Sequence, residues 1–189
     1  MTDRTLDALE QISLADLDPM DLIAPNFRVY ELTASEIASR LRVDNRFPGD
    51  RELRAAVNLA RRVLQPIRNE FGRLSPNSVF RSQALECVLK NKPPGWLSTS
   101  QHTEGCACDI EIPGMSTLAL AQWAAEFLPD YDQIICECFD PGAGPNSGWV
   151  HISLKAPGQG SNRKQLLTYL RDLQSGAMVY VQGLRGSVT

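Results

Sequence analysis

The chain contains 189 residues, of which 43% are hydrophobic and 22% charged, and its formal net charge is -3. This composition is typical of a soluble globular protein with one core, and the net negative charge offers no general attraction to nucleic acid. No stretch is long and apolar enough to span a membrane, and no apolar run follows basic residues near the start. We therefore expect a protein without a signal peptide that is cytoplasmic as synthesised.

Residues 1–26 carry many acidic residues and few large apolar residues apart from leucines. They are predicted to form an N-terminal extension with a short helix around residues 5–12. The remaining residues, 27–189, are expected to form one domain.

The first half of this domain indicates helices and one strand. Residues 33–41 begin with capping residues and continue with helical spacing, and residues 50–71 repeat apolar side chains along one stripe. Pro66 is expected to kink the second helix or to shorten its end. Residues 78–80 are predicted to form a strand that delivers Arg81.

The second half alternates strand and helix signals. Apolar spacing and flanking Gly, Pro and Ser residues predict helices over residues 84–89, 116–127 and 162–173. Strands are predicted over residues 107–112 and 134–139, around His151, and over residues 178–182. The Gly- and Pro-rich residues 140–148 indicate a long hairpin loop between two of these strands. Together these elements predict a mixed α+β fold.

The chain has only two histidines, and both lie in segments that suggest a metal site. Together with Asp109, which lies in a strand-like run, His102 and His151 supply two nitrogen ligands and one oxygen ligand. Catalytic zinc takes three such protein ligands and keeps its fourth position for water. Gly105, between the first two ligands, allows the loop to fold back through a positive φ. A single histidine is most often an ordinary polar residue, but here both fall in the pattern.

Strand alternation predicts which side chains share a face with the metal ligands. It places Asp109 and Glu137 on the face opposite to the four cysteines of two Cys-x-Cys pairs, Cys106, Cys108, Cys136 and Cys138. The total of five cysteines is odd, and no secretory signal accompanies them. Packing of free thiols in the core is therefore favoured, with disulfides or a second metal site as alternatives.

Three sequence strings carry a resemblance to a known family: SQHTEGCACDIEI, then YDQIICE, then GWVHISL. They resemble the zinc peptidases of the D-alanyl-D-alanine carboxypeptidase family, which includes dipeptidases and phage endolysins, through its S-x-H-x-x-G-x-A-x-D signature and a later W-x-H. The likeness covers about residues 27–183. It implies the hedgehog/DD-peptidase fold, in which a small antiparallel sheet carries the zinc site and helices pack on one side.

The resemblance also implies roles for individual residues. His102, Asp109 and His151 match the zinc ligands of the family, and Glu137 matches its catalytic base. Zinc makes a water molecule acidic enough to lose a proton near neutral pH, and it polarises the scissile carbonyl. The base then accepts the proton of the water and passes it to the leaving amine.

Three further residues are expected to act on the substrate. Arg81 matches an arginine that in several members of the family helps to hold the substrate or the developing oxyanion. Ser100 is the first serine of the zinc signature and Trp149 is the tryptophan of the later motif. Both are predicted to contact the substrate.

The function implied by this resemblance is hydrolysis of peptide bonds in the stem peptides of bacterial peptidoglycan. The protein would be a carboxypeptidase or an endolysin-type endopeptidase of phage or prophage origin, which reaches the cell wall after release from the cytoplasm. Two alternatives accompany this prediction. One is a noncatalytic zinc-binding structural or virion module of the same fold, and the other is a cytoplasmic dipeptidase that acts on free D-Ala-D-Ala.

Overall fold

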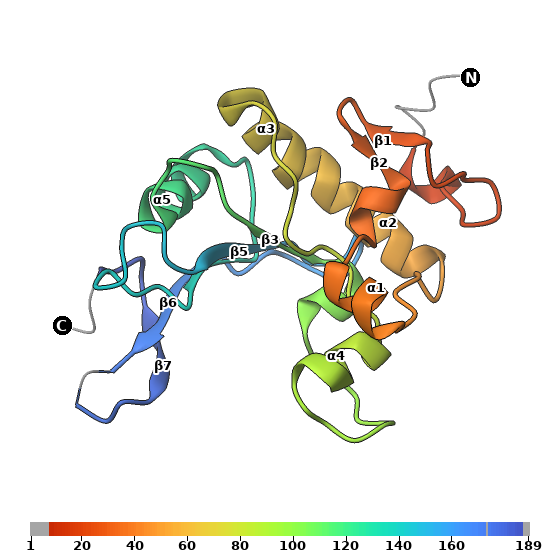
Figure 1. Ribbon diagram of the computed structural model, residues 1–189. Coiled ribbons are helices and arrows are strands. Elements are labelled where there is room, and N and C mark those ends of the chain that lie inside the picture. Colours follow the sequence, from red (N-terminus) through yellow and green to blue (C-terminus); the bar gives the residue numbers. More distant parts are fainter. Residues whose placement is uncertain (1–7, 173, 187–189) are drawn as a thin grey trace.

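The computed structural model describes residues 8–172 and 174–186 of the chain (Figure 1). The predicted mixed α+β character is confirmed. A five-stranded sheet has the strand order β3-β5-β4-β6-β7, and a separate two-stranded sheet pairs β1 with β2. The residues proposed to bind metal lie at and beside the β3 edge of the larger sheet.

The helices are α1 (Glu36–Leu41), α2 (Asp50–Leu59), α3 (Gln65–Phe71), α4 (Gln83–Leu89) and α5 (Thr117–Phe127). The strands are β1 (Leu22–Ala24), β2 (Phe27–Arg28), β3 (Ala107–Ile110), β4 (Gln133–Glu137), β5 (Trp149–Ser153), β6 (Gln165–Arg171) and β7 (Met178–Gln182). Short 3₁₀ turns are η1 (Leu9–Gln11), η2 (Val29–Leu32) and η4 (Gln101–Glu104), and η3 (Ala60–Leu64) is a π-helical segment. Of the helix expected around residues 5–12, residues 5–7 lie outside the described residues and the rest contains only η1.

Serine side chains cap three of the helices. Ser35, Ser82 and Ser116 each accept a 3.1 Å hydrogen bond from a backbone N–H in the first turn of α1, α4 and α5 respectively. Such a cap satisfies an amide that has no partner within the helix. The helices predicted at these three places are confirmed.

The helix predicted over residues 50–71 is continuous from α2 through η3 to α3. Pro66 does not shorten it, because the chain stays helical to Phe71. Proline lacks the N–H that would bond to the carbonyl four residues earlier, and its ring crowds that turn. The wider π turns of η3 lie directly before Pro66, and such turns are one way in which a helix accommodates an interruption.

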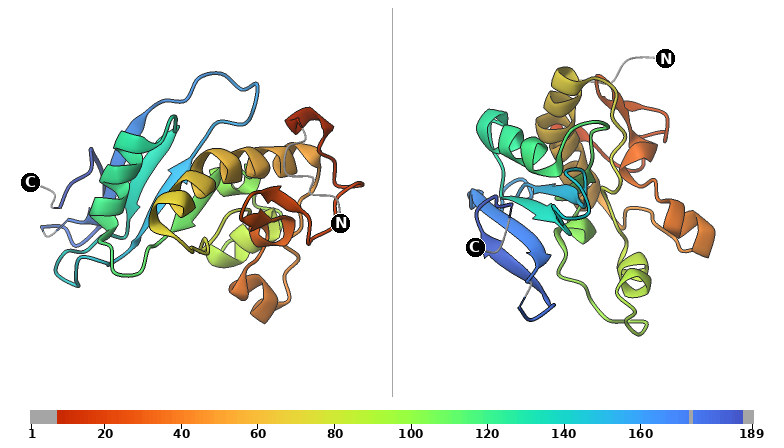
Figure 2. Two further views of the ribbon diagram at one scale, coloured as in Figure 1. Left: turned by 90° about the horizontal axis from the view of Figure 1, so that it is seen from above. Right: turned by 60° about the vertical axis from the view of Figure 1, so that its left-hand side comes forward.

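The main core lies between the larger sheet and the long helix and α5, and Figures 1 and 2 show α3 and α5 on the same side of that sheet. Fully buried side chains from both layers meet there, among them Leu53, Val57, Leu120, Ile134 and Ile152. The segment before β2 also contributes to this core, because Ile12, Ile23 and Ala24 are buried in it. Arg54 on α2 fixes that segment by donating a 2.7 Å hydrogen bond from Nε to the Ile12 carbonyl.

The larger sheet is not purely antiparallel, since β4 and β6 run parallel. The helix predicted over residues 162–173 is wrong for the described part of that range, which contains β6. Its leucines, Leu166, Leu167 and Leu170, have a spacing that suits a helix as well as a strand, and a short apolar run does not distinguish the two. Pairing with β4 on one side and β7 on the other gives the backbone of this segment its partners.

Two smaller strand predictions also need correction. Residues 78–80 form no strand, because only Ser78 pairs with β3 and the Phe80 N–H already bonds to the Leu32 carbonyl. Strand β4 ends at Glu137, and Cys138 takes a positive φ of 52° and is exposed. Strand alternation therefore stops before Cys138, which does not lie beneath the sheet. The strand predicted over residues 178–182 is confirmed as β7.

Candidate metal centre

Three residues predicted as metal ligands lie together. Asp109 on β3 and His151 on β5 are direct cross-strand partners, so their side chains share one face of the sheet. His102 comes from η4, which precedes β3. One potential ligand atom from each residue lies within 4.8 Å of the others, and all three residues are buried.

Gly105 makes the return from His102 to β3 possible for two reasons. Its φ is 71°, a conformation that side chains disfavour, as the sequence predicted. In addition, a Cβ at this position would collide with the backbone carbonyl oxygen of Glu52 on α2. The glycine therefore sets both the direction of the turn and the close contact between η4 and the long helix.

Hydrogen bonding determines which nitrogen of His102 faces the other ligands. Its Nδ1 lies 2.7 Å from the Val79 carbonyl oxygen, which only accepts, so Nδ1 carries the proton. In the neutral ring Nε2 then has a free electron pair, and it lies 3.1 Å from Asp109 Oδ1 and 3.2 Å from His151 Nδ1. The same Oδ1 lies 3.0 Å from His151 Nδ1. Such carbonyl partners are what fix histidine orientation in metal sites.

The protonation states also suit a metal site. Burial lowers the pKa of His102 below its ordinary value, although Asp109 opposes this, so the neutral form is favoured at pH 7. Burial alone would raise the pKa of Asp109, but its contacts with His102 and His151 bring it well below its usual range, so the carboxylate is ionised at pH 7. An ionised carboxylate beside a free imidazole electron pair is the donor set that binds a cation.

The spacing of the three atoms fits a small ion with tetrahedral coordination. Zinc bonds of about 2.0–2.1 Å to nitrogen or oxygen imply about 3.3 Å between neighbouring ligands of a tetrahedron. The three separations observed, 3.0, 3.1 and 3.2 Å, are close to that value. A proton on His151 Nδ1 would leave the contact between His102 Nε2 and Asp109 Oδ1 without a hydrogen, whereas a metal ion would satisfy all three contacts. The buried His-Asp-His group can therefore hold a metal ion.

Glu137, predicted as the catalytic base, lies on the same face of the sheet. Ile135 pairs with His151 and Glu137 pairs with Trp149, so Glu137 and His151 are diagonal neighbours on adjacent strands. Diagonal neighbours on adjacent strands lie about 7–8 Å apart at their backbones, a distance that a glutamate side chain can span. Burial raises the pKa of Glu137 above its ordinary value, against the opposing effects of His151, Arg81 and Trp149. It is not one of the three clustered ligands.

Trp149 contacts the predicted base directly, because its Nε1 donates a 3.1 Å hydrogen bond to Glu137 Oε2. The close approach of the two strands at this point depends on Gly148, whose φ is 69° and where a Cβ would collide with the Glu137 carbonyl oxygen. Trp149, predicted to bind substrate, is therefore placed to orient Glu137.

Arg81 reaches the metal ligands from the segment that precedes α4. Its backbone N–H bonds to the His102 carbonyl at 3.2 Å, and its side-chain Nη2 lies 3.6 Å from Asp109 Oδ2. Asp109 thus presents Oδ1 to the two histidines and Oδ2 to the arginine. The Ser100 hydroxyl does not cap η4; instead the Ser100 carbonyl accepts a 2.7 Å hydrogen bond from Thr103 Oγ1.

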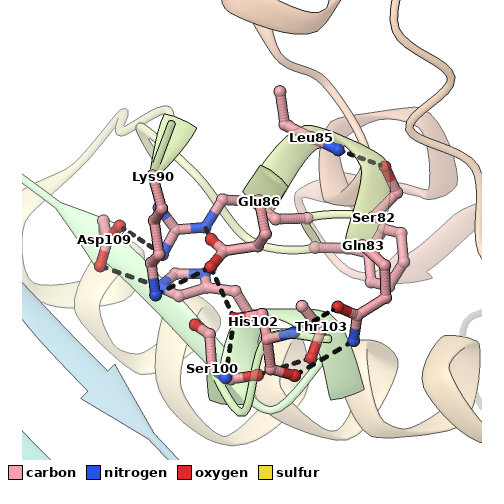
Figure 3. Close-up of polar contacts among 12 residues, drawn as sticks. Ser82, Gln83, Leu85, Glu86, Lys90, Ser100, His102, Thr103 and Asp109 are labelled. Carbon is pink, nitrogen blue, oxygen red and sulfur yellow. Dashed lines mark hydrogen bonds and ion pairs between the residues drawn. The ribbon is translucent and has the colours of Figure 1, made fainter. Parts of the chain in front are cut away.

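Glu86 on α4 is a buried acid that sequence patterns did not single out. Its side chain is fully buried, and its two oxygens contact Arg81, Lys90 and Ser98. Figure 3 shows the Glu86 side chain among its polar contacts. A possible signal exists in the sequence, because Glu86 is the only charged residue in the apolar run of residues 84–89. That signal predicts an unusual burial but not its partners.

A pocket of about 590 Å³ opens beside Arg81. Apolar side chains of α1 and α4 and polar side chains of residues 75–78 line it. Among these, Ser78 pairs with Asp109, so the pocket lies next to the ligand-bearing strand.

Four of the five cysteines are buried, and all five are free thiols. Cys108 and Cys136 belong to the main core beneath the sheet, and Cys106 packs against Ala55 and Ala156. Core packing of these thiols is confirmed, with the exposed Cys138 as the exception.

No protein family, curated protein or solved structure matches this chain. Within the described residues, none of the helices combines the length and the apolar character needed to cross a membrane.

Proposed function

We propose that this protein is a zinc-dependent hydrolase that cleaves peptide bonds in bacterial peptidoglycan. The observation that carries the proposal is the buried cluster of His102, Asp109 and His151, with Glu137 on the same sheet face but outside the cluster. Three protein ligands leave a coordination position for water on a catalytic zinc ion, and a nearby carboxylate outside the ligand set can accept a proton from that water.

Zinc fits this donor set, because two imidazoles and one carboxylate at these separations match its preferred ligands and geometry. When bound, zinc supplies a Lewis acid that polarises a carbonyl and makes a water molecule acidic enough to lose a proton near pH 7. The Val79 carbonyl supports this role from the chain side, since it keeps the free electron pair of His102 on Nε2.

Glu137 would serve as the base that accepts a proton from the attacking water and returns it to the leaving amine. The hydrogen bond from Trp149 holds one of its oxygens, which leaves the other available for the proton. The Arg81 guanidinium lies beside Asp109, a proposed metal ligand, and therefore close to where the substrate would react. From there it would stabilise negative charge that develops on the substrate.

The choice of substrate comes from the sequence motifs that resemble the D-alanyl-D-alanine carboxypeptidase family. Its members act on peptides of the bacterial cell wall, and the pocket beside Arg81 could take part of such a peptide. Carboxypeptidase and endolysin-type endopeptidase activities both fit this proposal, as do phage or prophage origin and action on the wall after release.

Two other functions use the same fold. A noncatalytic zinc-binding structural or virion module would not need Glu137 to be buried beside the ligands and bonded to Trp149, which favours the hydrolase. A dipeptidase for free D-Ala-D-Ala would use the same site on a smaller substrate.

The test uses zinc-loaded protein, its Glu137→Gln variant, and Glu126→Gln as a matched control on the exposed surface of α5. Each is incubated with purified peptidoglycan and, separately, with D-Ala-D-Ala, and the products are identified by mass spectrometry. We expect new peptide termini from the wild type and the control but not from Glu137→Gln. Cleavage of the dipeptide alone would support the dipeptidase. Stoichiometric zinc without any product would overturn the hydrolase in favour of a binding module.

A further inference from the structure

Glu86 is a fully buried carboxylate with more than one cationic partner. Its Oε2 accepts from Lys90 Nζ at 2.9 Å and from Ser98 Oγ at 2.8 Å. Its Oε1 lies 3.0 Å from Arg81 Nε, although the two atoms are not aligned as a hydrogen bond. The contact of Oε1 is therefore an electrostatic one, directed at the arginine that approaches the metal ligands.

Burial would make this carboxylate costly unless it were compensated. Burial alone raises the pKa of Glu86, but Lys90 and Ser98, together with the charge of Arg81, bring it below its ordinary value. Glu86 is thus ionised at neutral pH. Lys90 and Ser98 contact Oε2, so the second oxygen, Oε1, faces Arg81.

Arg81 lies between two carboxylates. Nε faces Glu86, and Nη2 lies 3.6 Å from Asp109 Oδ2. Figure 3 shows Glu86 pointing from α4 toward the side on which Asp109 and His102 lie. A guanidinium so close to a ligand of a divalent cation is repelled by that cation, and this repulsion acts strongly where water is excluded.

We propose that Glu86 is a positioning residue that holds the Arg81 guanidinium beside the candidate metal centre. Its negative charge also offsets the positive charge of that guanidinium. Through Arg81, Glu86 strengthens metal binding and sets the orientation of the guanidinium during turnover. The inference rests on the metal-binding part of the proposed function, but not on the identity of the substrate. Outer partners of this kind typically change metal affinity or activity by about 10–100-fold.

The experiment measures zinc affinity by competition with a fluorescent chelator, which requires no activity. Glu86→Gln keeps the shape of the side chain and removes its charge, and we expect about 10–100-fold weaker zinc binding. Glu126→Gln makes the same charge change on α5 and should bind zinc like the wild type.

A double-mutant cycle separates an effect through Arg81 from a simple change in total charge. In the Arg81→Gln background, Glu86→Gln should weaken zinc binding several-fold less than it does in the wild type. An equal loss in both backgrounds, or no loss in either, would overturn the inference. If Glu86→Gln does not fold, Glu86→Asp keeps the charge but withdraws it from Arg81, and wild-type affinity in that variant would also overturn it.

Turnover provides a second readout that a purely structural role would not change. With zinc at saturating concentration, Glu86→Gln should lower kcat more than it raises KM, because Arg81 acts on charge that develops during the reaction. Absence of any hydrolysis by the zinc-loaded wild type would instead count against the proposed function, and it would leave the affinity result to decide on Glu86.

Discussion

The two faces of β3, β4 and β5 carry opposite chemistry, although their residues alternate along the same short segments. One face presents Asp109, His151 and Glu137. The other presents apolar side chains and thiols, among them Cys108 and Cys136, which are fully buried against the helices. Neighbours in the sequence therefore differ completely in surroundings, because successive side chains in a strand point to opposite faces.

The comparison shows how one sheet supports both stability and chemistry. The core face removes apolar surface from water and fixes the strand register. That register places Asp109 opposite His151 and Glu137 opposite Trp149. A shift of one residue would exchange the faces of a strand, so the geometry of the candidate metal centre depends on the packing of side chains that are not part of it.

The largest effect is expected when one of the three proposed metal ligands is removed. Replacement of His102, Asp109 or His151 by Ala should abolish stoichiometric zinc binding, because two protein ligands do not complete the site. Cys108→Ala, next to Asp109 on the opposite face, is the matched control and should retain one zinc per chain. Metal content after dialysis, measured by atomic spectroscopy, checks both, and full retention in all three ligand variants would refute the site.

A change of the proposed base should separate chemistry from binding. Glu137→Gln should keep zinc but lower turnover by about 10²–10⁴-fold, since the amide cannot accept the proton. Cys136→Ala, one residue earlier and on the core face, should keep most of its activity. Rates on peptidoglycan fragments, with zinc content measured in parallel, test the difference. Equal rates for Glu137→Gln and the wild type would show that Glu137 is not the base.

A further buried carboxylate, Asp132, should affect the stability of the fold without affecting zinc affinity. Its side chain is fully buried and accepts 3.0 Å hydrogen bonds from Arg163 Nε and a 2.9 Å bond from Gln101. Asp132→Asn leaves the half-exposed Arg163 without its charged partner and weakens the hydrogen bonds to a buried carboxylate, which should cost about 1–3 kcal/mol of unfolding free energy. Denaturant unfolding checks the loss, and chelator competition should show unchanged zinc affinity. A stability change below about 0.5 kcal/mol would contradict the role of this ion pair.

The same pair predicts a dependence of stability on pH. Burial alone would raise the pKa of Asp132, but the bonds from Arg163 and Gln101 lower it below its ordinary value. A carboxylate with a lowered folded-state pKa contributes its full stability above the unfolded-state value of about 3.9 and loses it as the pH falls toward the folded-state pKa. The difference between wild type and Asp132→Asn should therefore shrink below about pH 4.

The smallest effects are expected among the thiols of the core face. Burial raises the pKa of Cys136 to about 12 and that of Cys108 well above its ordinary value, so neither should react with iodoacetamide in the folded protein. The exposed Cys138 should be alkylated first, as peptide mass spectrometry would show. Cys108→Ala should cost only about 1–2 kcal/mol of unfolding free energy, through the small cavity that it leaves. Rapid labelling of Cys108 would contradict its position in the core.

Local patterns in the sequence were sufficient for much of the site. The two histidines and Asp109, the turn at Gly105 and the alternation of Glu137 with Cys136 follow from residue type, glycine geometry and strand periodicity. The turn and the alternation depend on neighbours that are close in the chain, whereas the meeting of His151 with Asp109 depends on the pairing of β5 with β3. The capped helices α1, α4 and α5 also depend on close neighbours.

Other features depend on segments that are far apart in the chain. The sequence alone determined the residue types of the candidate metal site, the capped helices and the faces of the central strands, because residue identity and short-range geometry control them. The tertiary structure decided that β6 pairs parallel to β4, that residues 78–80 make only one bridge, and that Glu86 faces Arg81. Backbone pairing and the burial of charge are settled only when distant segments meet, so no local pattern predicts them.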